Sequence, residues 1–395
     1  MTVRPITPEE LTDSRKINTI AFVVRREKDK EEAFCQKEMA RTRASFDEQG
    51  KMTSSVQLFH YNVRFDGKIL GMGGVGGVAS LPESRGQGNI RALMAYILRE
   101  MYDNGTALST LFPFSHVFYR QFGYEHTCFI RELTLPLSEL KPLHARGTLR
   151  QFMPQDDFKP LNDIYNTFTK NANLSVLRED DHWKGWLNRD PYETRWYTYV
   201  WYDSTGRARA YAITRPEEEP GKERALFLED VACADSEALE GLFSKLRVLD
   251  AQYQDLRWRV PDWIHPTLLF TEPYRAEQSV EARAMARVVN VRAVLEAMRH
   301  PDAPGSYTIR VFDPYLPENE GIWHVRFGHG QARAERDDGA EPGMEADIPL
   351  LTLMALGYCD FDDLLWSRPA VRPPKDIATF RSVFIRKKNY LADFF

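Results

Sequence analysis

One segment joins a predicted strand to a predicted helix through a glycine-containing loop, and it reads Val78-Ala79-Ser80-Leu81-Pro82-Glu83-Ser84-Arg85-Gly86-Gln87-Gly88-Asn89-Ile90-Arg91-Ala92-Leu93-Met94. After the loop, apolar residues recur at the spacing of one helix face: Ile90, Leu93, Met94, Ile97, Leu98, Met101 and Tyr102. This spacing predicts an amphipathic helix of about four turns that begins at Asn89. Backbone N–H groups at the start of such a helix are unpaired, and the helix dipole makes that end positive.

The loop has the composition of an anion site. Glycine at positions 86 and 88 allows the backbone to approach phosphate oxygens, and Arg85 can add charge-assisted hydrogen bonds. A pyrophosphate therefore fits a site made by Arg85, Gly86, Gln87, Gly88 and Asn89. Taken alone, Arg-Gly-x-Gly is more typical of an ordinary turn before a helix, so the surrounding segments matter.

The residues before this segment predict a mixed α/β layer. Thr7-Pro8-Glu9-Glu10 is typical of a helix start, because Thr7 can cap and Glu10 can close a capping box. Residues 56–65 alternate as a half-buried strand does, and Asp66-Gly67 predicts a hairpin turn into the glycine-rich residues 69–80. Residues 107–112 predict a further strand. So much glycine in a strand indicates that something approaches its backbone closely.

Two more regions follow. Residues 196–202, 207–214 and 225–232 predict strands, and a helix is expected from Ser236 to about Tyr253, but the junction Cys233-Ala234-Asp235-Ser236 has no glycine loop. The last hundred residues predict strands at 307–312 and 321–327, an Ala- and Glu-rich turn region, and a helix from Ile348 to Leu356. A length of 395 residues suits two or three domains, and we expect boundaries near residues 148 and 285.

The composition excludes several classes of function. Against 52 Lys and Arg stand 57 Asp and Glu, so the net charge is -5 and gives no global attraction to nucleic acid or anionic lipid. No run of about 18 apolar residues predicts a membrane span, and no signal-peptide core follows Met1, so we expect a cytoplasmic protein. The histidines and cysteines lack metal-ligand spacing, and we expect no metal site.

Together with a later aromatic segment, the loop resembles two motifs of the GNAT acyltransferases. The aromatic segment reads Phe118-Tyr119-Arg120-Gln121-Phe122-Gly123-Tyr124. In that family an R-x-x-G-x-G/A loop holds the pyrophosphate of acetyl-CoA, and an F-Y-x-x-x-G-F/Y segment lies by the thioester. The last loop position departs from this pattern, since it is Ile90. The run G-x-[L/I]-R-A-L-M, here Gly88 to Met94, resembles the Eis (enhanced intracellular survival) branch of the family.

The resemblance implies an α+β fold in three parts. Residues 1–148 would form a catalytic GNAT domain, and residues 149–285 a degenerate GNAT-like mixed α/β domain that lacks the CoA loop. Residues 286–395 would form a sterol-carrier-protein-like α+β domain whose C-terminus reaches the active site. The resemblance also implies a homo-oligomer, a hexamer in the family.

The resemblance implies roles for individual residues, with acetyl-CoA as the cosubstrate. Val78, Ala79 and Ser80 would hold the pantetheine arm, and the loop with Ile90 the pyrophosphate. Tyr119 would be the general acid that protonates the departing thiolate, and the α-carboxylate of Phe395 the base. Ser115 and His116 could contact acetyl-CoA or the acceptor, or simply shape their loop. An α-carboxylate is a weak base for an amine unless apolar groups surround it, and Phe394 and Phe395 would supply them.

The resemblance further implies acetyl transfer to a primary amine of a small polyamine such as an aminoglycoside. Such a cation calls for an acidic pocket. The segment that borders the acceptor cleft in the family reads Arg25-Arg26-Glu27-Lys28-Asp29-Lys30 here and is locally basic. Candidate compensating acids are Glu32, Glu38 and Asp393. Two alternatives stay open: an acetyl-CoA-binding sensor or regulatory protein, and a lysine (protein) acetyltransferase.

Overall fold

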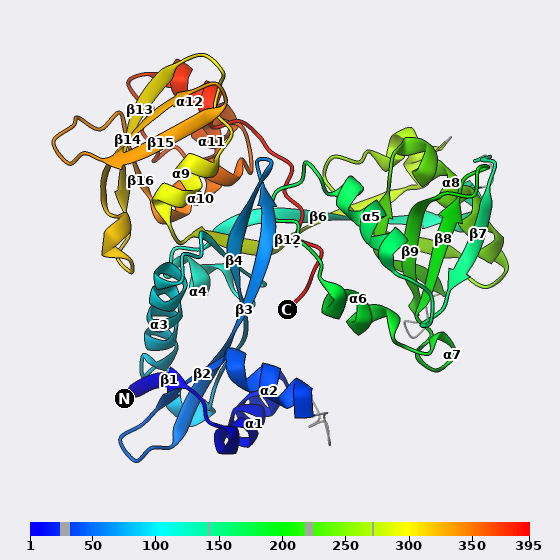
Figure 1. The fold of residues 1–395 in the computed structure, drawn as a ribbon, viewed down its shortest axis with the longest axis horizontal. Helices are drawn as coiled ribbons and strands as arrows, with labels where there is room; N and C mark the ends of the chain where they lie inside the picture. Colours follow the sequence, from blue (N-terminus) through cyan, green and yellow to red (C-terminus); the bar gives the residue numbers. More distant parts are fainter. Residues whose placement is uncertain (24–31, 141–142, 218–223, 271) are drawn as a thin grey trace. The chain divides into compact units, whose positions relative to one another are not determined.

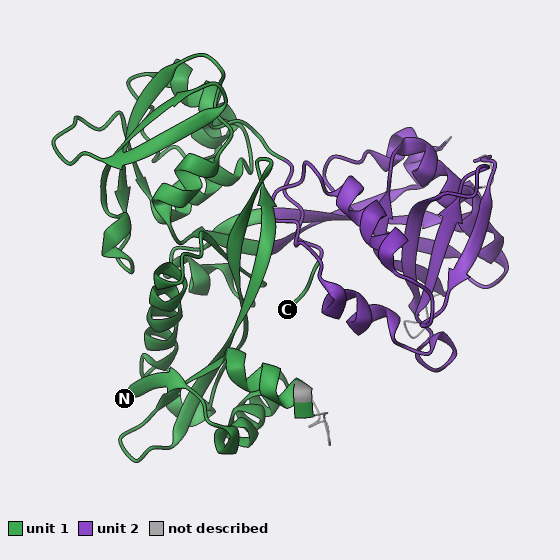
Figure 2. Cartoon of the chain, viewed as in Figure 1, with its two compact units in different colours: residues 1–127, 284–387, 393–395 green, residues 128–283, 388–392 purple. Residues whose placement is uncertain are grey.

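The computed structural model describes residues 1–23, 32–140, 143–217, 224–270 and 272–395 (Figure 1). It contains two compact units (Figure 2), the first made of residues 1–127, 284–387 and 393–395, and the second of residues 128–283 and 388–392. The unit boundaries fall within β6 (Glu125–Pro136) and β12 (Glu277–Val288). None of the described helices has the length and apolar character that a membrane crossing requires. The basic segment 25–30 lies outside the described residues.

The first unit begins with a sheet whose strand order is β1-β2-β3-β4-β5-β12. Neighbouring strands are antiparallel except β4 and β5, which run parallel. The other strands are β1 (Thr2–Pro5), β2 (Thr42–Phe46), β3 (Met52–Phe65), β4 (Lys68–Ser80) and β5 (Leu108–Leu111). The helices are α1 (Leu11–Phe22), α2 (Glu32–Arg41), α3 (Asn89–Asp103) and α4 (His116–Arg120), with the 3-10 turns η1 (Pro8–Glu10) and η2 (Pro82–Ser84).

The hairpin turn and the helix start predicted in this region are confirmed. Asp66 and Gly67 have φ values of 50° and 83° and join β3 to β4 in a two-residue hairpin. At the start of the 3-10 turn η1, which leads into α1, the Thr7 N–H donates to Glu10 Oε2 at 2.8 Å, as in a capping box. The glycine-rich residues 69–80 belong to the single strand β4, which pairs with β3.

The helix α3 supplies the apolar face that the sequence predicted. Leu93, Met94, Ile97, Leu98 and Met101 are all fully buried and join one core with residues of β3 and β4. Gly73 of β4 allows this close packing, because a Cβ there would lie 2.1 Å from the sulfur of Met101. The helix therefore lies tight against β4, and its N-terminus is fixed beside the end of that strand.

The second unit contains a sheet of order β6-β11-β10-β9-β8-β7. Its strands are β7 (Thr148–Phe152), β8 (Tyr197–Tyr202), β9 (Ala208–Glu217), β10 (Ala225–Cys233) and β11 (Asp255–Val260), besides β6. Its helices are α5 (Lys159–Phe168), α6 (Asp180–Leu187), α7 (Pro191–Thr194) and α8 (Ser236–Leu246), with 3-10 turns η3 (Leu137–Leu140), η4 (Arg247–Ala251), η5 (Pro266–Leu268) and η6 (Pro273–Arg275). The order β8, β9, β10, α8 repeats the order β3, β4, α3 only in outline.

The remainder of the first unit is a four-stranded sheet of order β15-β14-β13-β16 with four helices. The strands are β13 (Gly305–Phe312), β14 (Gly321–Gly328), β15 (Gln331–Arg336) and β16 (Met344–Asp347). The helices are α9 (Val291–Ala297), α10 (Ile348–Leu356), α11 (Phe361–Ser367) and α12 (Ile377–Val383), with the turn η7 (Pro317–Asn319). The predicted helix 348–356 is confirmed.

Three sequence expectations are corrected. The region expected to be an Ala- and Glu-rich turn contains the strand β15, a polar strand at the edge of its sheet. The α-helix expected to run to about Tyr253 ends at Leu246, where a 3-10 turn continues the chain. The strands β1 and β2 were not anticipated, since Thr42–Phe46 is buried on both faces and shows no alternation.

Candidate active site

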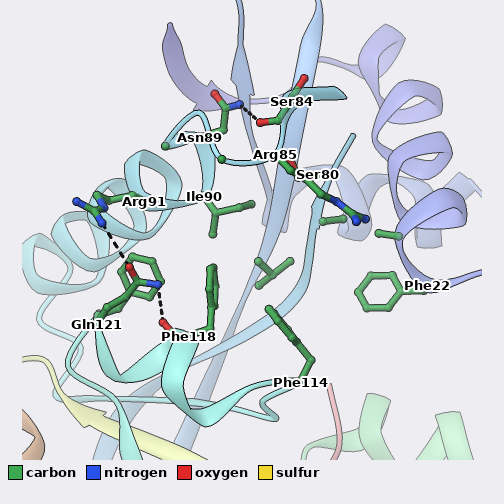
Figure 3. Close-up of a pocket in the computed structure, with 16 residues that line it drawn as sticks. Phe22, Ser80, Ser84, Arg85, Asn89, Ile90, Arg91, Phe114, Phe118 and Gln121 are labelled. Carbon is green, nitrogen blue, oxygen red and sulfur yellow. Dashed lines mark hydrogen bonds between the residues drawn. The ribbon is translucent and has the colours of Figure 1, made fainter. Parts of the chain in front are cut away.

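A cavity of about 960 Å³ lies where β4 ends and α3 begins (Figure 3). Its walls come from the end of α1, the end of β4, the loop between β4 and α3, the first turn of α3, and the segment around α4. The lining residues are Ala21, Phe22, Val78, Ala79, Ser80, Ser84, Arg85, Gly86, Gly88, Asn89, Ile90, Arg91, Phe114, Phe118, Gln121 and Phe122. Two arginines and no acid are among them, so one end of the cavity is positive while the rest is largely apolar.

The positive end is the loop between β4 and α3. Gly86 and Gly88 have φ values of 77° and 81°, in the left-handed region, and no atom lies within 4 Å of where their Cβ atoms would be. Gly88 occupies the position before α3 without offering a capping side chain. The first N–H groups of α3 thus remain available to an anion. Asn89 closes the loop, because its side-chain amide donates to the Ser84 carbonyl at 3.0 Å.

The strand β4 separates from β5 as it reaches the cavity. The pairing of β4 with β5 ends at Val75 and Leu111, whereas the pairing of β4 with β3 continues to Ser80. Between these points the register shifts, and Gly77 has a φ of 55°, which is a bulge on β4. Backbone groups of residues 78–80 that would have met β5 therefore face the cavity, where they can pair with amide groups of an extended ligand.

The aromatic wall of the cavity, formed by Phe114, Phe118 and Phe122, is joined to α3 by a chain of polar contacts. Arg91 donates to Gln121 Oε1 at 3.4 Å, and the Gln121 amide donates to the Phe118 carbonyl at 2.8 Å (Figure 3). Further back, Arg287 is fully buried and donates to the Phe122 carbonyl and, at 2.7 Å, to both oxygens of Asp313. These bonds fix the backbone that follows α4.

Tyr119 lies behind this wall rather than in it. The side chain is 3% exposed, and its ring meets Phe118 and Phe114 edge to face at 5.2 and 5.4 Å. Burial raises the pKa of Tyr119 well above that of a free tyrosine, so the phenol keeps its proton at neutral pH. Tyr124 is fully buried and bonded to Ser109 at 2.7 Å, in agreement with a packing role.

The C-terminal residue lies on β4, two residues before the cavity wall begins. The Phe395 ring contacts Tyr61, Phe59 and Phe112, with centroids 5.3, 5.7 and 5.3 Å away. A Cβ on Gly74 would lie 2.7 Å from that ring, and a Cβ on Gly76 would lie 3.1 Å from the Phe395 backbone oxygen. The close approach that the glycine-rich strand predicted is therefore made by the end of the chain itself.

Most of the residues expected to bind the cofactor line the cavity. Val78, Ala79, Ser80, Arg85, Gly86, Gly88, Asn89 and Ile90 do so. Gln87 points elsewhere, because its exposed amide donates to the Glu83 carbonyl at 3.1 Å. Ser115 does not line the cavity either, since its Oγ accepts from the Phe118 N–H at 3.3 Å and caps α4. His116 packs edge to face on His126 at 5.8 Å.

Sequence reasoning missed several lining residues. Phe118, Gln121 and Phe122 belong to the aromatic segment 118–124, and Phe114 lies just before α4; all four line the cavity. Phe22 and Ala21 come from the end of α1, where no local signal distinguishes a cavity residue from an exposed one.

Comparison with family models identifies three domains. An acetyltransferase (GNAT) domain model matches residues 2–127, a second acetyltransferase (GNAT) domain model matches residues 174–288, and a sterol carrier protein domain model matches residues 291–392. The cavity described above lies within the first match. A search among curated proteins finds no match.

Solved structures of the same fold cover the whole chain. A protein from Enterococcus faecalis V583 titled a probable N-acyltransferase is 26% identical, with a TM-score of 0.88, over 100% of this chain and 99% of that one. A GCN5-related N-acetyltransferase from Anabaena variabilis is 21% identical, with a TM-score of 0.87, over 100% of both chains. Eis1 from Mycobacterium abscessus is 18% identical, with a TM-score of 0.81, also over 100% of both chains.

Proposed function

Because this chain is a GNAT N-acetyltransferase with the three-domain organisation of the Eis-like proteins, we propose that it transfers the acetyl group of acetyl-CoA to a primary amine of a small molecule. One observation carries the proposal: the strand β4 lines the cavity with Val78, Ala79 and Ser80 and carries the chain terminus at Gly74 and Gly76. A donor in the cavity and a carboxylate at the terminus would thus meet along one strand.

The donor side is assigned to the cavity. The N–H groups at the start of α3 and the Arg85 guanidinium suit the negative pyrophosphate of acetyl-CoA. The free backbone edge of residues 78–80 suits the amides of the pantetheine arm. The thioester carries the acetyl group in activated form.

Two groups of this chain would move the protons of the reaction. The amine must lose a proton to attack the thioester carbonyl, and the α-carboxylate of Phe395 would accept it. As the new C–N bond forms, the C–S bond breaks, and the thiolate needs a proton that Tyr119 would supply. Aromatic rings around a carboxylate make it a stronger base than it is in water. Burial keeps Tyr119 protonated until the thiolate forms.

The acidic residues of this region bear on which amine is acetylated. The resemblance points to a polyamine such as an aminoglycoside, which needs acidic partners. Glu38 is already bonded to Arg15 at 2.7 and 3.1 Å, and Glu32 is exposed on the first turn of α2. Asp393 is buried and lies close enough to Tyr61 to influence its pKa. Of the three candidate acids, Glu38 is therefore already paired with a cation of the chain itself.

The test is thiol release from acetyl-CoA by the purified protein, against a panel of aminoglycosides, linear polyamines, monoamines, amino acids and lysine peptides. A variant with one glycine added after Phe395 is measured beside the natural chain. We expect turnover with at least one amine and its loss in the extended variant, because the carboxylate is displaced. Binding of acetyl-CoA without release by any amine would favour the sensor alternative, and acetyl-lysine on a protein substrate would favour the protein acetyltransferase.

We also propose a homo-oligomer, since the resemblance implies a hexamer. Sedimentation velocity at several concentrations checks it: a species of six chains supports the proposal, and a monomer throughout contradicts it.

A further inference from the structure

Arg41 places a positive charge beside the chain terminus. It is the last residue of α2, and its guanidinium carbon lies 4.4 Å from the centre of the Phe59 ring. The Phe59 ring also contacts the ring of Phe395, with 5.7 Å between centroids. Phe59 also stacks on Tyr61 at 6.2 Å with the planes 3° apart, and Phe395 contacts both of these parallel rings.

Among the described residues, no carboxylate forms an ion pair with Arg41, and Glu38 acts on its charge only from a distance. The buried Nε atom has no hydrogen-bond partner within the described part of the chain. The acid closest in sequence on the same helix, Glu38, is 6% exposed and is held by Arg15 through two hydrogen bonds. Burial lowers the pKa of Arg41, which reflects the cost of keeping this cation away from water.

An unpaired, half-buried arginine is expensive unless an anion completes it. The guanidinium is planar and binds carboxylates with two parallel hydrogen bonds, so an anion on the acceptor would complete it well. The acceptor must also bring its amine to the carboxylate of Phe395 for the proposed reaction. Arg41 and the terminal residue Phe395 both lie beside the Phe59 ring, and two such opposite charges are the pattern that binds a molecule with charges of both signs.

We propose that the acceptor is an amine that also carries a carboxylate, which Arg41 binds while the amine lies at Phe395. This inference rests on the proposed acetyl transfer and names its substrate class. It runs against a polycationic acceptor, because every additional ammonium group would meet the Arg41 charge instead of an acid. The stacked rings of Phe59 and Tyr61 would line the path between the two ends of such an acceptor.

The experiment compares amines that differ only in the second charge. Thiol release is measured with 5-aminopentanoate, pentylamine and cadaverine, and with tyrosine and tyramine, for the natural chain, Arg41→Gln and Arg41→Lys. Lys16→Gln is the matched control, since Lys16 is a solvent-exposed cation on α1 that pairs with Asp13. Thermal unfolding and the KM for acetyl-CoA establish that each variant is folded and binds the donor.

We expect the natural chain to prefer the carboxylate-bearing member of each set by about tenfold or more in kcat/KM. Arg41→Gln should abolish that preference through KM, Arg41→Lys should restore part of it, and Lys16→Gln should leave it unchanged. Preference for cadaverine, or an equal loss on amines with and without a carboxylate, would overturn the inference while leaving acetyl transfer intact. If none of the amines tested caused thiol release, that result would contradict the proposed function, and the inference with it.

Discussion

The two GNAT domains of this chain differ most at the point where a strand passes into a helix. In the first, β4 reaches α3 through a loop in which Gly88 precedes the helix and offers no side chain to cap it. In the second, β10 reaches α8 directly, and Asp235 caps the helix by accepting from the Ala238 N–H at 3.0 Å. The first helix start is left open to an external anion, whereas the second already holds a carboxylate of its own.

The surroundings of the two junctions differ in charge as well. The cavity at the first junction has Arg85 and Arg91 in its walls and no acid. The cavity at the second, about 690 Å³, is lined by charges of both signs: four aspartates (Asp157, Asp163, Asp203 and Asp235) and three cations (Lys159, Arg207 and Arg209). The nearby Arg209 is already paired with Asp235 and Glu237. In the second domain, an acidic side chain thus fills the helix start at which an anion is proposed to bind in the first, although both domains keep the strand and the helix.

The largest effect is expected from removing the proposed acid of the first domain. Tyr119→Phe should lower kcat by about 10²- to 10⁴-fold with little change in the KM for acetyl-CoA, because the phenol would act only as sulfur departs. The matched change in the second domain is Tyr211→Phe, since Tyr211 is also buried and donates to Asp230 at 2.7 Å. Steady-state kinetics should show normal turnover for that variant. Equal turnover in Tyr119→Phe and the natural chain would remove Tyr119 from the mechanism.

The next change converts the first junction into a copy of the second. Gly88→Asp adds a carboxylate where the pyrophosphate is proposed to bind and should raise the Kd for acetyl-CoA by about 10- to 100-fold, through repulsion and loss of open N–H groups. Gly206→Asp is the control for backbone strain, because Gly206 has a φ of 82° and no neighbouring atom within 4 Å. Calorimetric titration distinguishes them. A similar Kd in both variants would contradict the assignment of the loop.

A smaller effect should follow from opening the second junction. Asp235→Ala removes the cap of α8 and should lower the free energy of unfolding by about 1 kcal/mol. Acetyl-CoA turnover should not change, because the first domain alone is proposed to bind the donor. Denaturant unfolding and thiol release provide the two measurements. Reduced turnover at full stability would assign the second junction a role in catalysis.

The smallest effect concerns α1, whose start also carries its own carboxylate. The hydrogen bond from Arg4 lowers the pKa of Glu10 from 4.5 to about 2, so the ionised form is favoured in the folded chain. Stability from this pair is present above about pH 4.5 and is lost as the pH falls toward 2. Arg4→Met should therefore lower Tm slightly at pH 6 and not at pH 2, whereas the exposed control Lys16→Met should show no such pH dependence. A Tm difference that stays constant with pH would contradict the pairing.

Much of the first domain could be predicted because its signals are local. The spacing of apolar residues from Ile90 to Tyr102 predicts α3, and Asp66-Gly67 predicts the hairpin. The loop glycines predict a helix start without a capping side chain. The strand β2 was not predicted because it is buried on both faces, and β15 was not predicted because a polar edge strand resembles a turn region.

The parts of the site that depend on tertiary packing could not be read from any local pattern. Phe22 reaches the cavity from the end of α1, and Arg41 reaches the Phe59 ring from α2. Glycines 74 and 76 did indicate a close approach, but only the folded chain shows that Phe395 makes it. A periodic sequence pattern shows which face of a helix or strand is buried. It does not show which residue from a distant part of the chain packs on that face.

The most direct test of the comparison is the number of acetyl-CoA molecules bound per chain, measured by isothermal titration calorimetry on the natural chain and on Gly88→Asp. We predict one molecule per chain in the natural protein, and binding that is strongly weakened in Gly88→Asp. Two molecules per chain, or one molecule bound with unchanged affinity in Gly88→Asp, would contradict the claim that the open start of α3 distinguishes the first domain from the second.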